Sequence, residues 1–243
     1  MDKILDFIKR YNILILMMLG FLLYFPSLFY DFVFDDNSLL LSNKYINGTV
    51  PINFIEFFIP SFVSDDIYMP LTFIIFWLII KIFGINSFVF HFINILFYVL
   101  SSIAFYYLLK RIIKNDLISF FATILYIIHP CHIECTAWIS IMGYNISVLF
   151  FFLSFLYFII AFDENKKLNY IYSLLFYIIA ILSQPIAVTL PAILFLWVYC
   201  FRKEQLSKSI IPIVSYIPFL FIYFYIAKRF YKQIGLVLLN IIF

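Results

Sequence analysis

Two adjacent carboxylates, Asp35 and Asp36, are the residues of this 243-residue chain best suited to chemistry. They follow the first apolar segment of a sequence that is 66% hydrophobic and only 12% charged. A carboxylate beside a hydroxyl accepts its proton during bond formation, and acids near a membrane segment are typical of functional sites. Neighbouring side chains project in different directions, so we expect the two acids to take separate roles. In an alternative interpretation, Asp36 or Asn37 caps a short helix over residues 38–42.

A second polar stretch contains His129, His132 and Glu134. Three interpretations of this stretch remain open. The side chains ligate a divalent metal, or they contact a phosphate or other substrate group while Glu134 fixes an imidazole tautomer, or they form a structural network at a helix end. Pro130 predicts that a helix ends here.

His91 lies inside another apolar segment, three residues before Asn94 and therefore on the same helical face. A buried hydrogen bond between helices is the favoured interpretation. Substrate binding by His91 is the alternative.

The surrounding composition is that of an all-α polytopic membrane protein, which excludes the soluble enzyme classes. The 16 Lys and Arg residues lie mostly in short loops and form no patch suited to nucleic acid. We expect one membrane domain over residues 1–243, surrounded by membrane lipids, whose first helix is retained because no small-residue cleavage site follows it. The three cysteines indicate no disulfide framework.

About seven membrane spans are predicted, at residues 11–30, 88–109, 117–128, 145–162, 169–182, 186–201 and 209–227. Pro191 should kink the sixth. Segment 71–83 is too short to cross, so it is placed in the interface with a short helix at 52–58, inside a first outer loop of about residues 31–87. This arrangement puts eleven bases in cytoplasmic loops and five outside, whereas a crossing segment gives seven and nine.

The predicted protein is therefore an integral, multi-pass protein of the plasma membrane or endoplasmic reticulum with a cytoplasmic N-terminus. Loops 110–116, 163–168 and 202–208 share that side. Loops 129–144 and 183–185 lie on the other side, with the Asp pair.

Several short motifs occur in a characteristic order. They are Phe32-Val33-Phe34-Asp35-Asp36, Met69-Pro70-Leu71-Thr72-Phe73, Phe83-Gly84-Ile85-Asn86, Phe90-His91-Phe92-Ile93-Asn94, His129-Pro130-Cys131-His132-Ile133-Glu134, Ala137-Trp138-Ile139-Ser140 and Ile186-Ala187-Val188-Thr189-Leu190-Pro191. In this order the chain resembles GT-C glycosyltransferases, in particular the membrane portion of the transmembrane-and-TPR O-mannosyltransferases and their prokaryotic relatives.

The resemblance implies transfer of mannose or a similar hexose from a polyprenyl-phosphate carrier to a protein or glycan acceptor on the extracytoplasmic or lumenal side, with inversion. It makes Asp35 the general base and Asp36 its neighbour in the acidic motif, and it places His129, His132 and Glu134 near the active site. No cofactor is assigned, and a divalent metal remains an alternative.

The chain departs from the family pattern at three places. Met69-Pro70-Leu71-Thr72 stands where relatives usually have Arg-Pro-Leu-Thr, Gly143-Tyr144-Asn145-Ile146 where they have Trp-Ile-Ser-Gly-Arg followed by an acid, and Ser183-Gln184-Pro185 where they usually have Ser-Lys-Glu. These charge losses favour a second hypothesis, an impaired or truncated relative that binds lipid carrier or a partner membrane protein. A small transporter or metal-handling protein is a third, but no charged residue lies at mid-depth of a predicted span.

Overall fold

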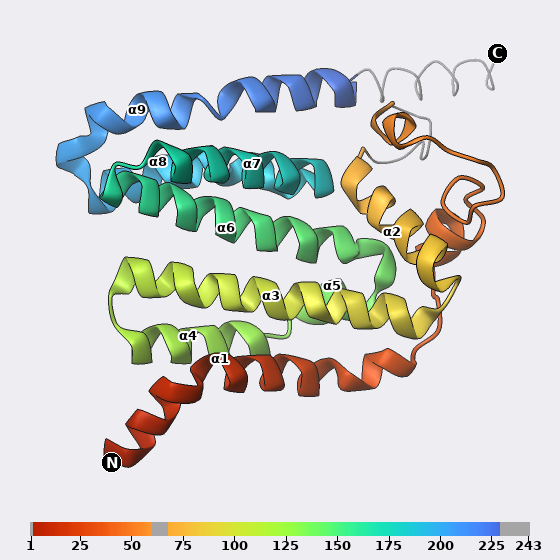
Figure 1. The fold of residues 1–243 in the computed structure, drawn as a ribbon, viewed down its shortest axis with the longest axis horizontal. Coiled ribbons are helices and arrows are strands. Elements are labelled where there is room, and N and C mark those ends of the chain that lie inside the picture. Colours follow the sequence, from red (N-terminus) through yellow and green to blue (C-terminus); the bar gives the residue numbers. More distant parts are fainter. Residues whose placement is uncertain (1, 60–67, 229–243) are drawn as a thin grey trace.

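The computed structural model describes residues 2–59 and 68–228, and the predicted all-α class is confirmed because those residues form helices and no strand. Figure 1 shows the longer helices lying side by side in layers, from α1 (Asp2–Tyr24) through α3 (Ser87–Ile113) and α6 (Met142–Glu164) to α7 (Lys167–Ser183) and a final helical segment. That segment comprises α9 (Leu206–Val214) and a further helical run over residues 217–228.

Four helical segments of the described chain are long and apolar enough to cross a membrane: Arg10–Phe29, Ser87–Ile113, Ile139–Glu164 and Ser209–Lys228. The other predicted spans are shorter apolar helices. They are α4 (Asp116–Ile128), α7, and η5 (Pro185–Thr189) followed by α8 (Leu190–Phe201). A 13-residue helix reaches only about 20 Å against a hydrocarbon thickness of about 30 Å. The predicted number of seven spans therefore stays a prediction.

The loop that is predicted to be the first outer loop contains the short helices that its sequence predicts, with shifted boundaries. The segment predicted at 52–58 is a 3-10 helix, η3 (Phe54–Phe58), and it begins late because Asn53 and Glu56 form a capping box at its start. The Glu56 carboxylate accepts a bond of 2.6 Å from the backbone N–H of Asn53. Segment 71–83 is α2 (Pro70–Phe83), whose 14 residues give about 21 Å. Residues 60–67 of this loop lie outside the described part.

Pro191 does not kink a continuous helix as predicted. The chain between residues 185 and 201 is divided instead into the 3-10 helix η5 and the α-helix α8, and Pro191 lies in the first turn of α8. A proline is tolerated there because the first-turn amides have no partner inside the helix. The predicted break between two helices at residues 183–185 is confirmed, since α7 ends at Ser183 and Gln184 is extended.

Loops that are predicted to lie on the same side of the membrane lie at the same end of the helical layers. In Figure 1 the α3–α4, α6–α7 and α8–α9 connections lie at the end where the chain begins, and the outer loop, α5 (His132–Ala137) and the α7–α8 turn lie at the other. At the first of these ends, the Asp163 carboxylate links neighbouring connections, because it accepts bonds from Arg111 at 3.2 Å and from Arg202 at 3.3 Å. We call this the ion-pair end, and the other the Asp35 end.

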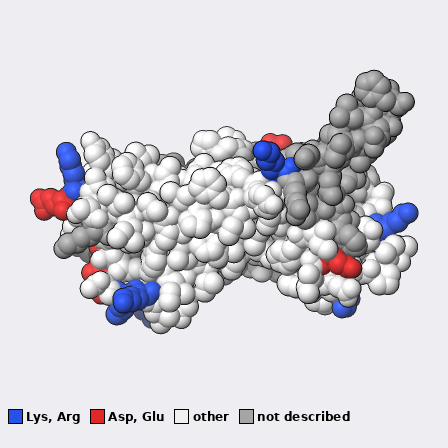
Figure 2. All heavy atoms as spheres, turned by 90° about the horizontal axis from the view of Figure 1, so that it is seen from above, with Lys and Arg blue, Asp and Glu red and all other residues white. Residues whose placement is uncertain are grey.

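The surface between the two ends lacks charge on the face that Figure 2 shows, where Lys, Arg, Asp and Glu gather toward the ends and a broad band carries none. Helix α3 illustrates the cause, because its first charged residue is Lys110, near its end. An uncharged band between charged ends is what a bilayer core requires.

Candidate functional site

The buried member of the acidic pair, Asp36, is held by three hydrogen bonds. Its side chain is completely buried. One oxygen accepts from the Ser140 amide at 2.7 Å and from the Ser140 hydroxyl, and the other accepts from the Val33 amide at 2.9 Å. Asp36 precedes the short helix η2 (Asn37–Leu41) but makes no capping bond to it, so the capping interpretation is wrong for Asp36. Its carboxylate instead joins the outer loop to η4 (Ile139–Ile141).

Asp35, in contrast, is exposed and has neither a hydrogen bond nor an ion pair from its side chain to any described residue. Its neighbours fix its position. Phe34 lies edge-on to Trp138 with ring centroids 5.8 Å apart, and Asp36 is bound to Ser140. Phe34 also has a φ of 47°, a rare value for a bulky residue that is typical of functional sites. The two acids therefore have different surroundings, and their separate roles stay a prediction.

The His129–Glu134 stretch lies at a helix end, as Pro130 predicts. Helix α4 ends at Ile128, and α5 begins at His132. His129 is exposed, and its Nδ1 accepts a bond of 3.2 Å from the Cys131 amide. This bond requires an unprotonated Nδ1, so the proton of the neutral ring is on Nε2, which is left free to donate. Glu134 is exposed and forms no such bond in the described chain, so the backbone and not Glu134 selects this tautomer.

His132 is half-buried against two tyrosines. Its ring centroid lies 4.3 Å from that of Tyr126 and 5.5 Å from that of Tyr98, and 6.3 Å from that of His129. Burial, and secondarily the charge of His129, lowers the pKa of the His132 imidazole below its usual value of 6.5. At neutral pH, His132 is therefore a hydrogen-bond donor without positive charge.

The metal interpretation of this stretch gains no support from the described residues, among which no three His, Cys, Asp or Glu side chains converge on a common point. Cys131 and Cys135 are free thiols. Their sulfur atoms join neither a disulfide nor such a cluster.

His91 and Asn94 have different environments despite their common helical face. Asn94 makes the predicted contact between helices, donating to the carbonyl of Thr136 at 2.9 Å and accepting from Asn145 at 2.8 Å. The His91 ring is 1% exposed, and neither of its nitrogens bonds to a described residue. The hydrogen-bond interpretation is therefore confirmed for Asn94, whereas no bond from the His91 ring to another helix is found among the described residues. Asp36 and the Tyr30 ring, whose centroid is 6.2 Å away, are neighbours of His91.

The sequence interpretation missed Ser140 and Asn145 as structural partners of this site. Both are buried. Ser140 belongs to one of the family motifs, and an Asn inside an apolar segment usually forms hydrogen bonds between helices. Either residue could therefore have been predicted from the sequence to be structurally important. The sequence does not reveal that Ser140 is the partner of Asp36, because the two residues are 104 positions apart.

The three places that depart from the family pattern meet at one point. The Thr72 hydroxyl of α2 donates a bond of 2.7 Å to the Ser183 carbonyl at the end of α7. A Cβ on Gly143 would lie 2.8 Å from the Thr72 hydroxyl oxygen and 3.0 Å from that same carbonyl. We call these three residues the Thr72 junction. Met69 and Gln184 stand at two of the positions where relatives usually have a charged residue. Both side chains are buried, and both residues are close in the sequence to a member of the junction.

Comparison with known proteins gives the chain its relatives. A protein O-mannosyl-transferase of Caenorhabditis elegans, F38B6.6, is 29% identical over 189 residues, which are 74% of this chain and 27% of that protein. The chain is a relative of protein O-mannosyl-transferases. Human (Homo sapiens) TMTC3 is 30% identical over 139 residues, and human TMTC4 is 31% identical over 157. The family resemblance predicted from the motifs is confirmed.

The chain spans only a small part of these relatives. The matched residues are 15% of human TMTC3 and 21% of human TMTC4, and they cover 55% and 56% of this chain. No protein-family model and no solved structure matches the chain.

Proposed function

We propose that this chain is, or belongs to, a glycosyltransferase that moves mannose or a similar hexose from a polyprenyl-phosphate carrier to an acceptor hydroxyl on the extracytoplasmic or lumenal side. The observation that supports this function best is the geometry of the acidic pair. Asp35 is exposed and unpaired among the described residues, while its neighbours on both sides are anchored to the segment 138–140. A base needs this combination, because it must be accessible to substrate and fixed in place.

In the proposed reaction, the Asp35 carboxylate accepts the proton of the acceptor hydroxyl while that oxygen attacks the anomeric carbon. The bond from this carbon to the phosphate oxygen breaks with an oxocarbenium-like transition state, and its electron pair leaves with the polyprenyl phosphate. Attack from the opposite face in one displacement inverts the configuration. The products are the glycosylated acceptor, the polyprenyl phosphate and a proton on Asp35 that passes to water.

The leaving phosphate needs hydrogen-bond donors as its charge develops. His129 offers Nε2–H in its neutral form, and His132 offers a neutral imidazole. Helix α5, which begins at His132, and the loop that contains Asp35 lie at the same end of the layers (Figure 1). His91 and Glu134 remain proposed substrate contacts, and a divalent metal remains an alternative electrophile.

The test is transfer of labelled sugar from a polyprenyl-phosphate donor in membranes that contain the protein. Asp35→Asn should lower the transfer rate by about 100-fold or more, because the amide cannot accept the proton. Asp31→Asn is the matched control, since Asp31 is an exposed acid of the same loop and its loss should leave the rate unchanged. Equal transfer by wild type and Asp35→Asn would remove Asp35 from the mechanism.

A non-catalytic relative that binds lipid carrier or a partner membrane protein is the second candidate. The Thr72 junction favours it, because three segments without their expected charges pack together there. Crosslinking of a photoreactive polyprenyl phosphate, measured on the same membranes, separates the candidates. Labelling without any sugar transfer would favour the second candidate.

A further inference from the structure

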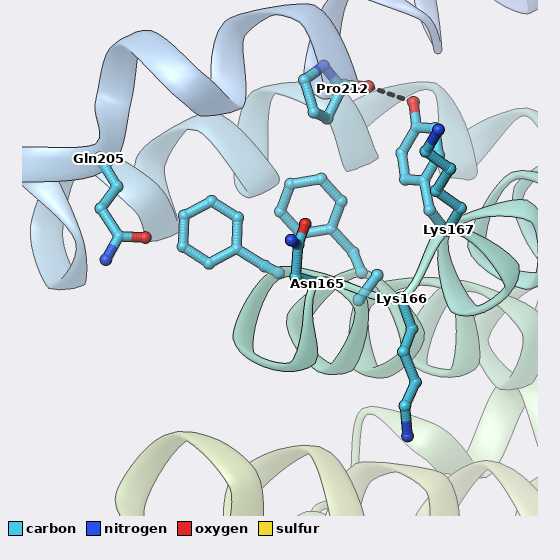
Figure 3. A pocket seen from close by; sticks show the side chains of 9 residues that line it. Asn165, Lys166, Lys167, Gln205 and Pro212 are labelled. Atoms are coloured by element: carbon cyan, nitrogen blue, oxygen red, sulfur yellow. Dashed lines mark hydrogen bonds between the residues drawn. The ribbon is translucent and has the colours of Figure 1, made fainter.

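A cavity of about 420 Å³ lies at the ion-pair end, away from Asp35 and its neighbours. It lies between α6, α7 and the segment that contains η6 (Lys203–Gln205) and α9 (Figure 3). Its lining residues are Phe158, Ala161, Phe162, Asn165, Lys166, Lys167, Tyr170, Gln205 and Pro212. The volume is within the usual range of small-molecule sites.

The cavity is apolar on one side and polar on the other. Phe158 and Phe162 supply aromatic wall, and both are on α6. The Tyr170 hydroxyl donates a bond of 2.6 Å to the Pro212 carbonyl, which fixes α7 against α9 at the opposite wall. Asn165, Lys167 and Gln205 supply the polar groups, so the cavity suits a molecule that is itself amphipathic.

The charge of the lining is positive only, since the nine residues include two lysines and no acid. Two neighbouring cavities differ, because Asp116 and Asp163 line one and Asp163 and Glu204 line the other. The Lys166 ammonium lies 2.9 Å from the Glu164 carboxylate and is thereby neutralised. Lys167 forms no ion pair with any described residue. Figure 3 shows Lys167 extending toward Pro212 and Lys166 extending the other way.

The level of the cavity along the helices identifies the source of the anion. It adjoins the last turn of α6 and the first turn of α7, where charged residues follow an otherwise uncharged helix, since Asp163 and Glu164 end α6 and Lys167 begins α7. In a membrane protein this is the level of the lipid head groups, and basic residues there attract anionic lipids.

We propose that this cavity binds one anionic phospholipid. Its phosphate lies beside Lys167, with Asn165 and Gln205 as hydrogen-bonding partners, and the start of an acyl chain lies against Phe158 and Phe162. Charge complementarity selects an anionic lipid over a zwitterionic one, and the aromatic wall selects a lipid over free phosphate. The proposal concerns the ion-pair end and is independent of sugar transfer.

The experiment measures lipid binding to the purified full chain in detergent micelles by native mass spectrometry. Phosphatidylglycerol and phosphatidylcholine with identical acyl chains are titrated separately, and inorganic phosphate is titrated in a third series. We expect one tightly held phosphatidylglycerol, with weaker binding of phosphatidylcholine and of phosphate alone. Lys167→Gln should weaken phosphatidylglycerol binding about tenfold, the value of one charge-assisted contact.

Lys114→Gln is the matched control, because it removes one exposed positive charge from the same end but outside this cavity. It should leave phosphatidylglycerol binding unchanged. Equal weakening of phosphatidylglycerol binding by both variants would show that general surface charge causes the effect. That result would overturn the proposed site. Equal binding of the two lipids, or binding of phosphate as tight as that of phosphatidylglycerol, would also overturn it.

Discussion

The charged side chains at the two ends of the helical layers are organised differently. At the ion-pair end they neutralise one another: Asp163 is shared by Arg111 and Arg202, and Glu164 by Arg111 and Lys166, while Lys110 pairs with Asp116. Such partly exposed pairs join neighbouring connections but contribute little stability each. All ion pairs of the described residues are at this end.

At the Asp35 end the described acids form no ion pair with a base. Asp36 is neutralised by donors, namely the amides of Val33 and Ser140 and the Ser140 hydroxyl. Asp35 is left without a partner among the described residues. Charged side chains thus pair with one another at the ion-pair end, whereas at the other end the exposed acid Asp35 has no partner among the described residues.

The largest expected effect on folding is that of Asp36→Asn. The Asn amide group cannot accept all three bonds, so buried donors lose their partner, at a cost of about 2–4 kcal/mol. We expect a clearly lower thermal midpoint in micelles and a smaller folded fraction on gel filtration. Asp35→Asn is the control, and its midpoint should match that of wild type because its side chain is exposed. Equal loss of stability in both variants would contradict the division of roles.

Next in size is Thr72→Val, which deletes the donor of the bond between α2 and α7. The buried Ser183 carbonyl loses that partner, at a cost of about 1–3 kcal/mol. Thr123→Val is the matched control, because the Thr123 hydroxyl bonds only to the Ser119 carbonyl of its own helix. Thermal unfolding in micelles should separate the two variants. Identical midpoints would show that the Thr72 junction does not fix α2.

A smaller effect is expected from acidification of the Asp35 end. The pKa of His132 is lowered in the folded protein, so the unfolded chain binds a proton at higher pH than the folded chain. The contribution of a neutral His132 to stability is therefore present above about pH 6.5 and is lost as the pH falls below that value. The thermal midpoint of wild type should drop more between pH 7.5 and pH 5.5 than that of His132→Phe. Parallel pH profiles would argue against this assignment.

The smallest expected effect is at the ion-pair end. Asp163→Asn removes the shared partner of Arg111 and Arg202, yet the Asp163 side chain is 24% exposed and its pairs are screened by water and salt. We expect a loss of about 1 kcal/mol or less, which shrinks further in high salt, measured as the thermal midpoint at low and high ionic strength. A loss as large as that of Asp36→Asn would remove the contrast between the ends.

The sequence alone determined the class of the protein and much of its plan. Long apolar runs can only be satisfied as helices in a membrane, so the all-α class and most helix positions followed from composition and periodicity. Local chemistry also gave the helix end before His129 and the break between two helices at residues 183–185. The different directions of the Asp35 and Asp36 side chains followed from elementary backbone geometry.

Only the tertiary structure decided which acid is buried and what holds it. Asp36 and Ser140 are 104 positions apart, and Thr72 and Ser183 are 111 apart, so no local pattern could pair them. The errors have the same cause. Capping by Asp36 or Asn37 was an alternative because it needs only neighbours in the sequence, and the sequence does not show that Asp36 contacts Ser140. A hydrogen bond was favoured for His91 because its position predicts burial, but burial does not identify a partner. Hydrogen bonds of buried polar groups are chosen by the packing of helices that are distant in sequence, and that packing is a property of the whole fold.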